Sequence, residues 1–433
     1  MTLRTRIAII LGKLVSTISK TFRLGAGATW PGEIALRMDP RILAVLSRRA
    51  PHVILVAGTN GKTTTVKMIE AILAHAGHSV VRNATGANLD NGLISAFLAD
   101  MMWNQMYQST YFIFEVDEAT LPNVLKDITP EVLVLTNLFR DQLDRYGEVD
   151  SIAEKWLVAL GALDKKTTVV VNADDPQLAF IASKLAATVK YFGLENPDLF
   201  LPKMQHATDT IYCPNCGARL TFAGVYFSHL GKWACGKCSF VPPAEDITSR
   251  EVVSPLEGVY NIYNTLAAAL TAQVLGVHKD TIHVGLTKFT PAFGRMENII
   301  VQNRRIKILL SKNPTGFNES LRTVAASVDR GPVLLALNDR IPDGRDVSWI
   351  WDVDFEFYKT FPKYLVSGDR VYDMALRLKY AEVDVKKTEI FPSLADAIDQ
   401  GIYSVKENEV LWILATYSAM LDTRKILTGR KIL

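Results

Sequence analysis

Short apolar runs alternate with longer amphipathic segments along most of the chain after residue 50. The first series predicts strands at residues 52–57, 111–116, 132–136 and 168–171, and a helix at 62–75. A second series predicts strands at 306–310, 333–337, 364–367 and 410–415, and helices at 318–327, 372–380 and 393–404. Strands separated by helices are typical of parallel sheets covered on both faces, so each series predicts an α/β domain, the second one Rossmann-like.

This pattern divides the chain into four parts. Residues 1–50 form an N-terminal segment, residues 51–300 the first α/β domain and residues 301–433 the second. The alternation breaks at residues 205–245, where all four cysteines fall, and we interpret this stretch as a module inserted in the first domain. The length of 433 residues agrees with roughly three domains of about 150 residues each.

The N-terminal segment is basic, with nine arginines and lysines against two acidic residues. A stripe of apolar residues runs through it at helical spacing: Ile7, Ile10, Leu11, Leu14, Val15 and Ile18. Either this stripe docks a helix on its own domain, which we favour, or the helix lies on an anionic membrane surface. Lys13 breaks the apolar run and no cleavage site follows, so we expect a cytoplasmic protein, peripheral at the inner face of the membrane in the second interpretation.

Composition excludes several classes of protein. Apolar residues make up 48% of the chain and charged residues 21%, as in soluble globular proteins. The net charge of +3 gives no general attraction to nucleic acid. No stretch of 18 apolar residues lacks a charge, so we expect no transmembrane span.

A glycine-rich segment between the first strand and its helix predicts a phosphate loop. It comprises Gly58, Thr59, Asn60, Gly61, Lys62, Thr63 and Thr64. Glycines let the backbone approach phosphate oxygens, and the helix N-terminus offers N–H groups to them. Position 56 is valine where the usual pattern has glycine, so a plain turn is the alternative. The placement favours ATP, with Lys62 at the phosphates and Thr63 on Mg²⁺.

Two groups of candidate metal ligands follow. Glu115, Asp117 and Glu118 end the strand at 111–116, where ligands and metal ions bind in open α/β sheets, although alone they would be better explained as a solvated loop. Two Cys-x-x-Cys hooks 18 residues apart predict a structural Zn²⁺ site rather than free or paired thiols: Cys213, Cys216, Cys235 and Cys238. We expect the aromatic residues of this insert to form its core: Phe222, Tyr226, Phe227 and Trp233.

The order of these motifs resembles the Mur ligases, ATP-dependent enzymes of peptidoglycan synthesis. The matching segments are GTNGKTTT, EVDEAT, TNLFRDQLDRYG, NADDP, GVYNIYNTLAA, GRME and KNP. The resemblance implies a Mur-ligase-type central ATPase domain in which Lys62 and Thr63 hold the phosphates and Mg²⁺. It also implies that Glu115 is a Mg²⁺ ligand, that Asn264 contacts the adenine and that Arg295 contacts the nucleotide.

The chain also departs from the amino-acid-adding Mur ligases. Gln142 stands where they carry a histidine, and Trp156 occupies the position of their carbamoylated lysine, which Lys155 misses by one. The resemblance therefore does not extend to their second metal site or amino-acid pocket.

A Mur-like domain with an inserted Cys₄ ribbon resembles the MurT subunits of lipid II isoglutaminyl synthases, and further matches lie at residues 338–352 and 414–420. The resemblance implies ATP-dependent amidation of the α-carboxylate of D-glutamate in lipid II, through an acyl phosphate. It also implies a GatD-like glutamine amidotransferase partner that supplies ammonia. Every cysteine is committed to the hooks, so this chain has no cysteine nucleophile for a glutaminase.

Asp346 and two neighbouring tryptophans form the last candidate site. By the same resemblance, Asp346 would give a carboxylate to the partner's Cys–His pair, and the alternative is an aspartate that caps its own turn. Trp349 and Trp351 suit a partner contact or a core equally well. Two other functions remain open: an amino-acid-adding or folylpolyglutamate synthetase-like ligase, and a nucleic-acid-binding ATPase, against which the few bases of the insert count.

Overall fold

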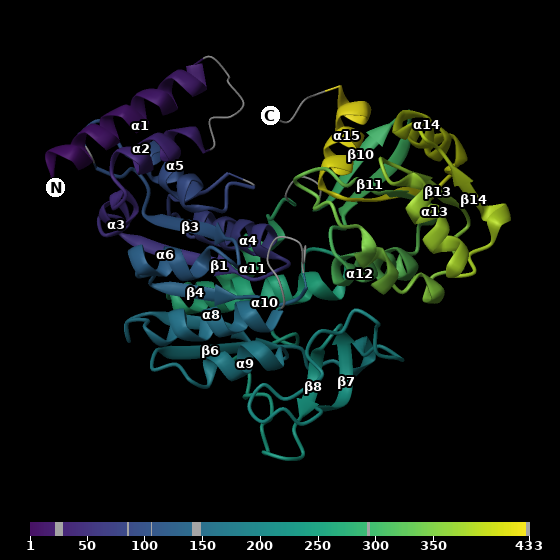
Figure 1. Ribbon diagram of the computed structural model, residues 1–433, viewed down its shortest axis with the longest axis horizontal. Helices are drawn as coiled ribbons and strands as arrows, with labels where there is room; N and C mark the ends of the chain where they lie inside the picture. The colour runs from purple at the N-terminus through teal and green to yellow at the C-terminus, as the bar shows by residue number, and fades with distance from the viewer. Residues whose placement is uncertain (22–28, 85, 105, 141–148, 292–294, 430–433) are drawn as a thin grey trace.

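The computed structural model describes residues 1–21, 29–84, 86–104, 106–140, 149–291 and 295–429. Two α/β domains lie side by side, and a two-stranded ribbon extends from the first of them (Figure 1). The α/β fold predicted from the alternating pattern is thereby confirmed.

A seven-stranded parallel sheet forms the first domain, in the order β2-β3-β1-β4-β5-β6-β9. Its strands are β1 (His52–Ala57), β2 (Val80–Arg82), β3 (Tyr111–Val116), β4 (Val132–Leu135), β5 (Thr168–Asn172), β6 (Thr188–Gly193) and β9 (Ile247–Thr248). The central strands β1, β3 and β4 are buried along nearly their whole length. Burial on both faces explains why they read as continuous apolar runs in the sequence.

Helices cover both faces of this sheet. One face is covered by α4 (Lys62–His75), α10 (Val259–Val274) and α11 (Lys279–Thr287). The other is covered by α3 (Ile42–Ser47), α5 (Asp90–Asp100), α6 (Leu121–Asp127), α8 (Val149–Gly161) and α9 (Pro176–Ala182). A short 3₁₀ turn, η1 (Pro197–Leu199), follows β6.

Two N-terminal helices, α1 (Leu3–Thr21) and α2 (Trp30–Met38), lie outside α5 as a further layer (Figure 1). The helix α1 buries a face of mostly small residues, among them Ala8, Gly12 and Ser16. A Cβ at Gly12 would come within 2.6 Å of the Leu98 side chain and 3.1 Å of the Pro31 carbonyl oxygen, so the close approach of α1 to its neighbours favours glycine.

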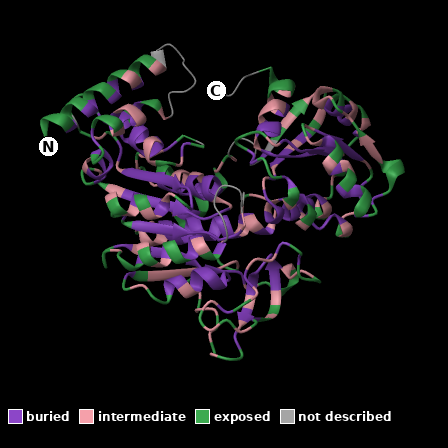
Figure 2. Ribbon diagram, viewed as in Figure 1, coloured by how far each residue is buried: buried purple, intermediate pink, exposed green. Residues whose placement is uncertain are grey.

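The predicted apolar stripe of α1 is not the docking face, and that part of the sequence interpretation is wrong. Its large side chains Ile7, Ile10, Leu11, Leu14 and Ile18 are between 36% and 50% exposed. Figure 2 shows exposed residues along the outer side of α1. The reason is geometric, because close helix packing selects small side chains and leaves the large ones outside.

The second domain has a six-stranded sheet in the order β10-β11-β15-β12-β13-β14, in which only β10 is antiparallel to its neighbour. Its strands are β10 (Arg295–Val301), β11 (Arg304–Leu310), β12 (Arg330–Ala336), β13 (Tyr364–Ser367), β14 (Thr388–Ile390) and β15 (Val410–Ala415). One face packs against α12 (Pro314–Ala326), α13 (Val371–Tyr380) and the 3₁₀ turns η2 (Ser348–Asp352) and η3 (Phe355–Phe357). The other packs against α14 (Leu394–Ser404) and α15 (Tyr417–Thr428), and η4 (Val385–Lys387) precedes β14.

The ribbon is an antiparallel hairpin of β7 (Thr221–Phe227) and β8 (Leu230–Ala234). Its predicted aromatic core is only half correct. Phe222 and Trp233 pack around the cysteines, but Tyr226 and Phe227 belong to the core of the first domain, where Phe227 lies 5.6 Å from Tyr263 between ring centroids. The tip of the hairpin therefore anchors the insert to the core of the first domain.

No helix in the described part of the chain combines the length and the apolar character needed to cross a membrane.

Candidate functional site

The glycine-rich segment turns from β1 directly into α4. Gly58 and Gly61 have φ angles of 136° and 88°, and Gly61 is the N-cap of α4. A Cβ at Gly61 would also lie 2.0 Å from Asn264 Oδ1. Backbone conformation and space therefore both require glycine here, and they leave the loop amides close to the cavity in front of α4.

The loop is held by the two residues that follow β4. Asn137 accepts the Thr59 and Asn60 N–H groups through its carbonyl and its Oδ1, at 3.0 and 2.8 Å. The Thr136 hydroxyl donates to the Asn60 carbonyl at 2.9 Å. These contacts fix the loop before any ligand binds, which is the preorganisation that a phosphate site needs.

Lys62 and Glu118 form a buried ion pair beside the loop. The Lys62 Nζ lies 3.0 Å from Glu118 Oε2 and also donates to the Gly58 carbonyl at 2.5 Å. Burial opposes ionisation of Glu118, but the charges of Lys62 and Lys312 outweigh it and lower the pKa of this carboxyl. The ionised carboxylate therefore fixes the Lys62 ammonium beside the loop, in an ion pair without net charge.

Trp156 fills the space behind this ion pair. Its indole N–H donates to the Glu118 carbonyl at 2.8 Å, and the side chain is fully buried. Lys155 is exposed on α8 and points away from this core. Neither residue can act as the carbamoylated lysine of the amino-acid-adding enzymes, and Gln142 lies outside the described residues.

Thr63 and Glu115 present two hard oxygen donors side by side. The Thr63 hydroxyl lies 2.6 Å from Glu115 Oε2, and both residues are buried. Asn83 holds Glu115 by accepting its N–H at 3.0 Å and donating to its carbonyl at 2.9 Å. Mg²⁺ prefers oxygen ligands and takes one or two from protein beside waters and phosphates, so this pair fits that ion.

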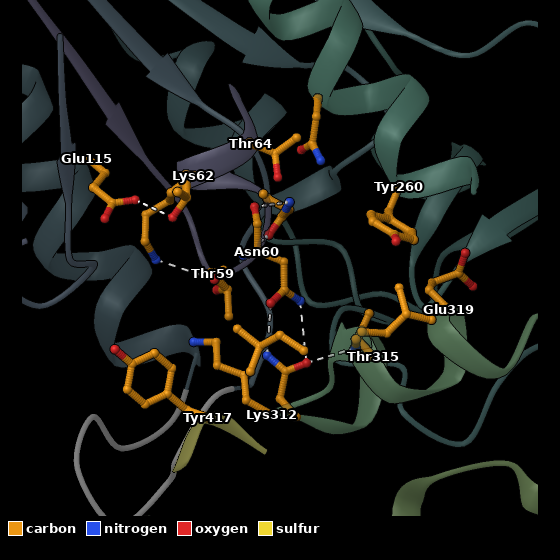
Figure 3. A pocket seen from close by; sticks show the side chains of 18 of the residues that line it. Thr59, Asn60, Lys62, Thr64, Glu115, Tyr260, Lys312, Thr315, Glu319 and Tyr417 are labelled. Atoms are coloured by element: carbon orange, nitrogen blue, oxygen red, sulfur yellow. Dashed lines mark hydrogen bonds between the residues drawn. The ribbon is translucent and has the colours of Figure 1, made fainter. Parts of the chain in front are cut away.

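A cavity of about 430 Å³ opens in front of the loop, between the two domains. The residues that the motifs assigned to nucleotide and Mg²⁺ and that line it are Thr59, Asn60, Gly61, Lys62, Thr63, Thr64, Glu115 and Asn264. Figure 3 shows Asn60, Lys62 and Glu115 gathered opposite Lys312 and Tyr417 of the second domain. The loop, the paired oxygens and a second lysine thus share one cavity.

The KNP motif brings the second domain onto the loop. Asn313 Nδ2 donates to Asn60 Oδ1 at 3.1 Å, and Asn313 Oδ1 caps α12 by accepting the Gly316 N–H at 2.8 Å. One side chain therefore starts a helix of the second domain and binds the phosphate loop of the first.

Glu319 is a cavity residue that the sequence analysis missed. Its Oε1 lies 3.5 Å from Gln205 Nε2 and 3.8 Å from Arg322, while Oε2 is buried with no hydrogen-bond partner among the described residues. Burial raises the pKa of this carboxyl to about 7, although Arg322 opposes the shift. The pattern of apolar and polar residues in α12 does not predict that Glu319 is buried, because the first domain is what covers it.

The NADDP motif is structural in this fold. Asp174 is fully buried and binds Lys232 of the ribbon at 3.0 Å, the Tyr263 hydroxyl at 2.7 Å and the Leu194 N–H at 2.8 Å. Burial raises its pKa to about 6, against the opposing effect of Lys232. Asp175 caps α9 through the N–H groups of its first turn. The motif joins the sheet, α10 and the ribbon.

The four cysteine sulfurs form one compact cluster. All four Sγ atoms lie within 4.8 Å of one another, and the pairs Cys213–Cys238 and Cys216–Cys235 are 3.6 and 3.5 Å apart. Bonds of about 2.3 Å in a tetrahedral zinc site place sulfurs roughly 3.8 Å apart, so the cluster is compatible with Zn²⁺. The four thiols are not joined by disulfides.

Two candidate residues lie apart from these groups. Asp346 is exposed and is not a lining residue of the cavity; its Oδ1 accepts the Ser348 N–H at 2.8 Å, and these local bonds lower its pKa. Arg295 begins β10, but its side chain lies outside what the structure describes. Of the two tryptophans, Trp349 packs on Phe317 and Trp351 is about half exposed.

Comparisons with known proteins agree with this arrangement. Residues 56–272 match the Mur ligase middle domain, and residues 310–420 match the family described as MurT ligase C-terminal. Among solved structures, a pseudomurein peptide ligase type C from Methanothermus fervidus has a TM-score of 0.67 at 23% identity, over 89% of this chain and 80% of that one. At that identity the likeness shows the fold alone.

Two relatives are similar over nearly the whole chain. The lipid II isoglutaminyl synthase (glutamine-hydrolyzing) subunit MurT of Staphylococcus aureus strain COL is 32% identical over 421 residues, 92% of this chain and 93% of that protein. The subunit of the same name from Streptococcus pneumoniae strain R6 is 30% identical, over 100% of this chain and 99% of its own. The family assigned from the motifs is confirmed, and the chain belongs to the MurT family of Mur ligases.

Proposed function

We propose that this chain is the synthetase subunit of a lipid II isoglutaminyl synthase. It amidates the α-carboxylate of D-glutamate in the lipid II stem peptide, with ATP and with ammonia from a GatD-like glutaminase. The observation that carries the proposal is the single cavity that joins the Lys62 loop, the Thr63–Glu115 pair and Lys312. The sequence relatives that bear this name support it.

The residues that line the cavity have different roles in binding ATP. The loop amides from Gly58 to Thr64 and the Lys62 ammonium hold the phosphates, and Thr63 with Glu115 holds Mg²⁺, which spreads the charge of the transferred group. Asn264 lies against Gly61 and lines the cavity, a position that suits a nucleotide contact. Arg295 at the start of β10 is assigned to the nucleotide by family alone. Transfer to the carboxylate gives an acyl phosphate, whose carbonyl ammonia attacks as phosphate leaves.

If ammonia is the nucleophile, the site needs no pocket for an incoming amino acid. An enzyme that adds an amino acid must hold that amino acid, whereas here buried Trp156 occupies the space behind Glu118. At neutral pH ammonia is mostly ammonium, so local delivery by a partner is the chemical solution. Both MurT relatives are named as subunits of glutamine-hydrolyzing enzymes, which supports a partner chain.

Asp346 is proposed to act on that partner. It lies exposed on the loop between β12 and η2, and the Ser348 N–H leaves room on its carboxylate for another donor. A carboxylate beside a Cys–His pair fixes the imidazole and stabilises its charged form. The exposed Trp351 on the same segment suits the surrounding interface.

Zinc in the Cys₄ cluster is proposed to be structural. Four protein thiolates fill a tetrahedral shell and leave no position for a substrate. The ion would hold the outer end of the hairpin whose tip enters the core of the first domain.

The complex of this chain with its glutaminase should convert lipid II, ATP, glutamine and water to amidated lipid II, ADP, phosphate and glutamate. Mass spectrometry of the released muropeptide distinguishes an amide from an added amino acid. Incorporation of an amino acid, or phosphate release that requires nucleic acid, would replace the proposal by one of the two alternative functions.

A further inference from the structure

The outer face of α1 carries a continuous apolar stripe that the fold does not use. Leu3, Ile7, Ile10, Leu14 and Ile18 follow one another at steps of three or four residues, with Leu11 beside them. All of them are exposed. They occupy one side of the helix over about four turns, which is the geometry of a surface made to contact something else.

The stripe is not needed to attach α1 to the protein, because the opposite face of the helix is already packed on its neighbours. Its opposite side is seated on α2 and α5 through Ala8, Gly12 and Ser16. Thr5 donates to Asp39 at 2.6 Å, and Lys13 donates to the Leu98 and Met101 carbonyls at the end of α5. The helix is thus fixed in place while its large apolar side chains stay exposed.

The charges on α1 identify the chemistry of the contact. The helix has four basic residues, Arg4, Arg6, Lys13 and Lys20, and no acidic residue. At 3.6 residues per turn, Arg4 and Arg6 lie on opposite flanks of the stripe, and both are exposed. The Arg4 Nε donates to the Met38 carbonyl, so only the two terminal nitrogens of its guanidinium are left for phosphate groups. Long basic side chains beside an apolar stripe reach phosphate groups while the stripe enters the acyl region.

An aromatic side chain extends this face. Trp103, 62% exposed, follows α5 and lies beside α1, with its ring centroid 5.1 Å from Lys13 Nζ. Lys13 is on the same flank of the helix as Arg6. Tryptophan favours the headgroup level of bilayers, where its ring is half apolar and its N–H is solvated.

We infer that α1 is an interfacial membrane anchor that binds bilayers with an anionic surface. The helix lies in the plane of the interface, with Ile7, Ile10, Leu14 and Ile18 inserted and the arginines on phosphate groups. The helix has no acidic residue on its 19 positions, and its basic residues flank the apolar stripe. This combination of charge and apolar surface favours an extended anionic surface such as a bilayer. Under the proposed function, this anchor brings the cavity to a lipid-linked substrate.

Vesicle flotation of the full chain tests the anchor without using the ligase reaction, so its outcome is independent of the proposed function. The chain should float with phosphatidylglycerol-containing vesicles, less so at high salt, and should not float with pure phosphatidylcholine vesicles. Ile10→Gln with Leu14→Gln should weaken binding about tenfold or more, because two inserted apolar groups are lost. Arg6→Gln should weaken it about fivefold.

The matched control is Val158→Gln with Val284→Gln, which changes two exposed valines on α8 and α11 and should leave binding unchanged. All variants should keep the wild-type melting temperature, since each side chain is exposed. Equal flotation with neutral vesicles, no flotation, or equal loss in the control pair would overturn the inference. So would a dimer or a partner complex that dissociates in the Ile10→Gln, Leu14→Gln chain without lipid, because a protein would then cover the stripe.

Discussion

Asn60 of the phosphate loop and Asn313 at the start of α12 are joined through their side-chain amides, although 253 positions separate them in the chain. The contact connects the glycine-rich loop of the first domain to α12, the first helix of the second domain. The placement of the second domain is therefore coupled to the geometry of the loop through this pair of residues.

Asn313→Ser should loosen this connection without removing the helix cap. Serine caps helices as well as asparagine does but is too short to reach Asn60. One hydrogen bond of about 1 kcal/mol corresponds to a severalfold rise in the KM for ATP, with little change in melting temperature. Asn313→Ala removes the cap too and should add a loss of about 1 kcal/mol in unfolding free energy. Equal stability of the two variants would contradict the capping role.

Lys62→Ala should abolish amidation and also destabilise the chain. The loss of a charge that serves the transferred phosphoryl group costs a hundredfold or more in rate. It also leaves Glu118 buried without its ion-pair partner, and breaking such a pair costs about 3–5 kcal/mol. The double variant Lys62→Ala, Glu118→Gln should recover most of the stability and none of the activity. Recovered turnover in the double variant would remove Lys62 from the nucleotide site.

Cys213→Ser should reduce the bound zinc from about one ion per chain to none and lower the melting temperature. The effect should spread beyond the ribbon, since Tyr226 and Phe227 at the hairpin tip belong to the core of the first domain. Metal analysis and calorimetry measure both. Tyr212→Ser, an exposed neighbour, is the control and should change neither. A Cys213→Ser chain of full stability but no activity would contradict a structural role.

Much of the fold was predictable because its strands are buried on both sides. His52–Ala57 and Tyr111–Val116 appear with the predicted bounds, since continuous apolar runs mark central parallel strands. The loop that follows His52–Ala57 was predictable from glycine, lysine and threonine in fixed order. Thr63 and Glu115 were both predicted to hold Mg²⁺. The start of α4 after β1 and the end of the neighbouring strand β3 bring the Thr63 hydroxyl to 2.6 Å from Glu115 Oε2.

The remaining features depend on contacts that no local pattern contains. Glu319 is buried because the first domain covers it, and its partner Gln205 comes from the segment before the ribbon. Phe227 lies outside the core of the ribbon because the tip of the hairpin reaches Tyr263 of the first domain. On α1, helix periodicity located the apolar stripe correctly but could not say which side meets the protein, because small residues form the closer contact.

Glu319→Gln should change how stability depends on pH. The pKa of Glu319 is about 7 in the folded chain against 4.5 ordinarily, so its stabilising contribution is present at low pH and is lost as pH rises toward 7. Glutamine does not ionise, so the variant's advantage in unfolding free energy should grow by about 2–3 kcal/mol between pH 5 and pH 8. Urea denaturation at both pH values measures it, with exposed Glu407→Gln as control. A constant difference would mean that Glu319 stays ionised beside Arg322.

Asp346→Asn separates the partner's chemistry from the structure of the turn. Asparagine retains the oxygen that accepts the Ser348 N–H, so the turn and the melting temperature should be unchanged. Only the negative charge is lost, and a Cys–His pair deprived of its carboxylate should slow by orders of magnitude, up to about 10⁴-fold. Glutamine-dependent amidation by the complex should therefore collapse while amidation from ammonium persists.

The control is Asp399→Asn, an exposed aspartate on α14, which should leave both activities intact. Size-exclusion chromatography establishes that the Asp346→Asn chain still binds the glutaminase, so a lost complex cannot be mistaken for lost catalysis. If both activities fall together with the melting temperature, Asp346 serves its own turn, because the Ser348 bond is then needed for the fold. If neither falls, the carboxylate that orients the partner's histidine comes from another residue, and the role assigned to Asp346 is wrong.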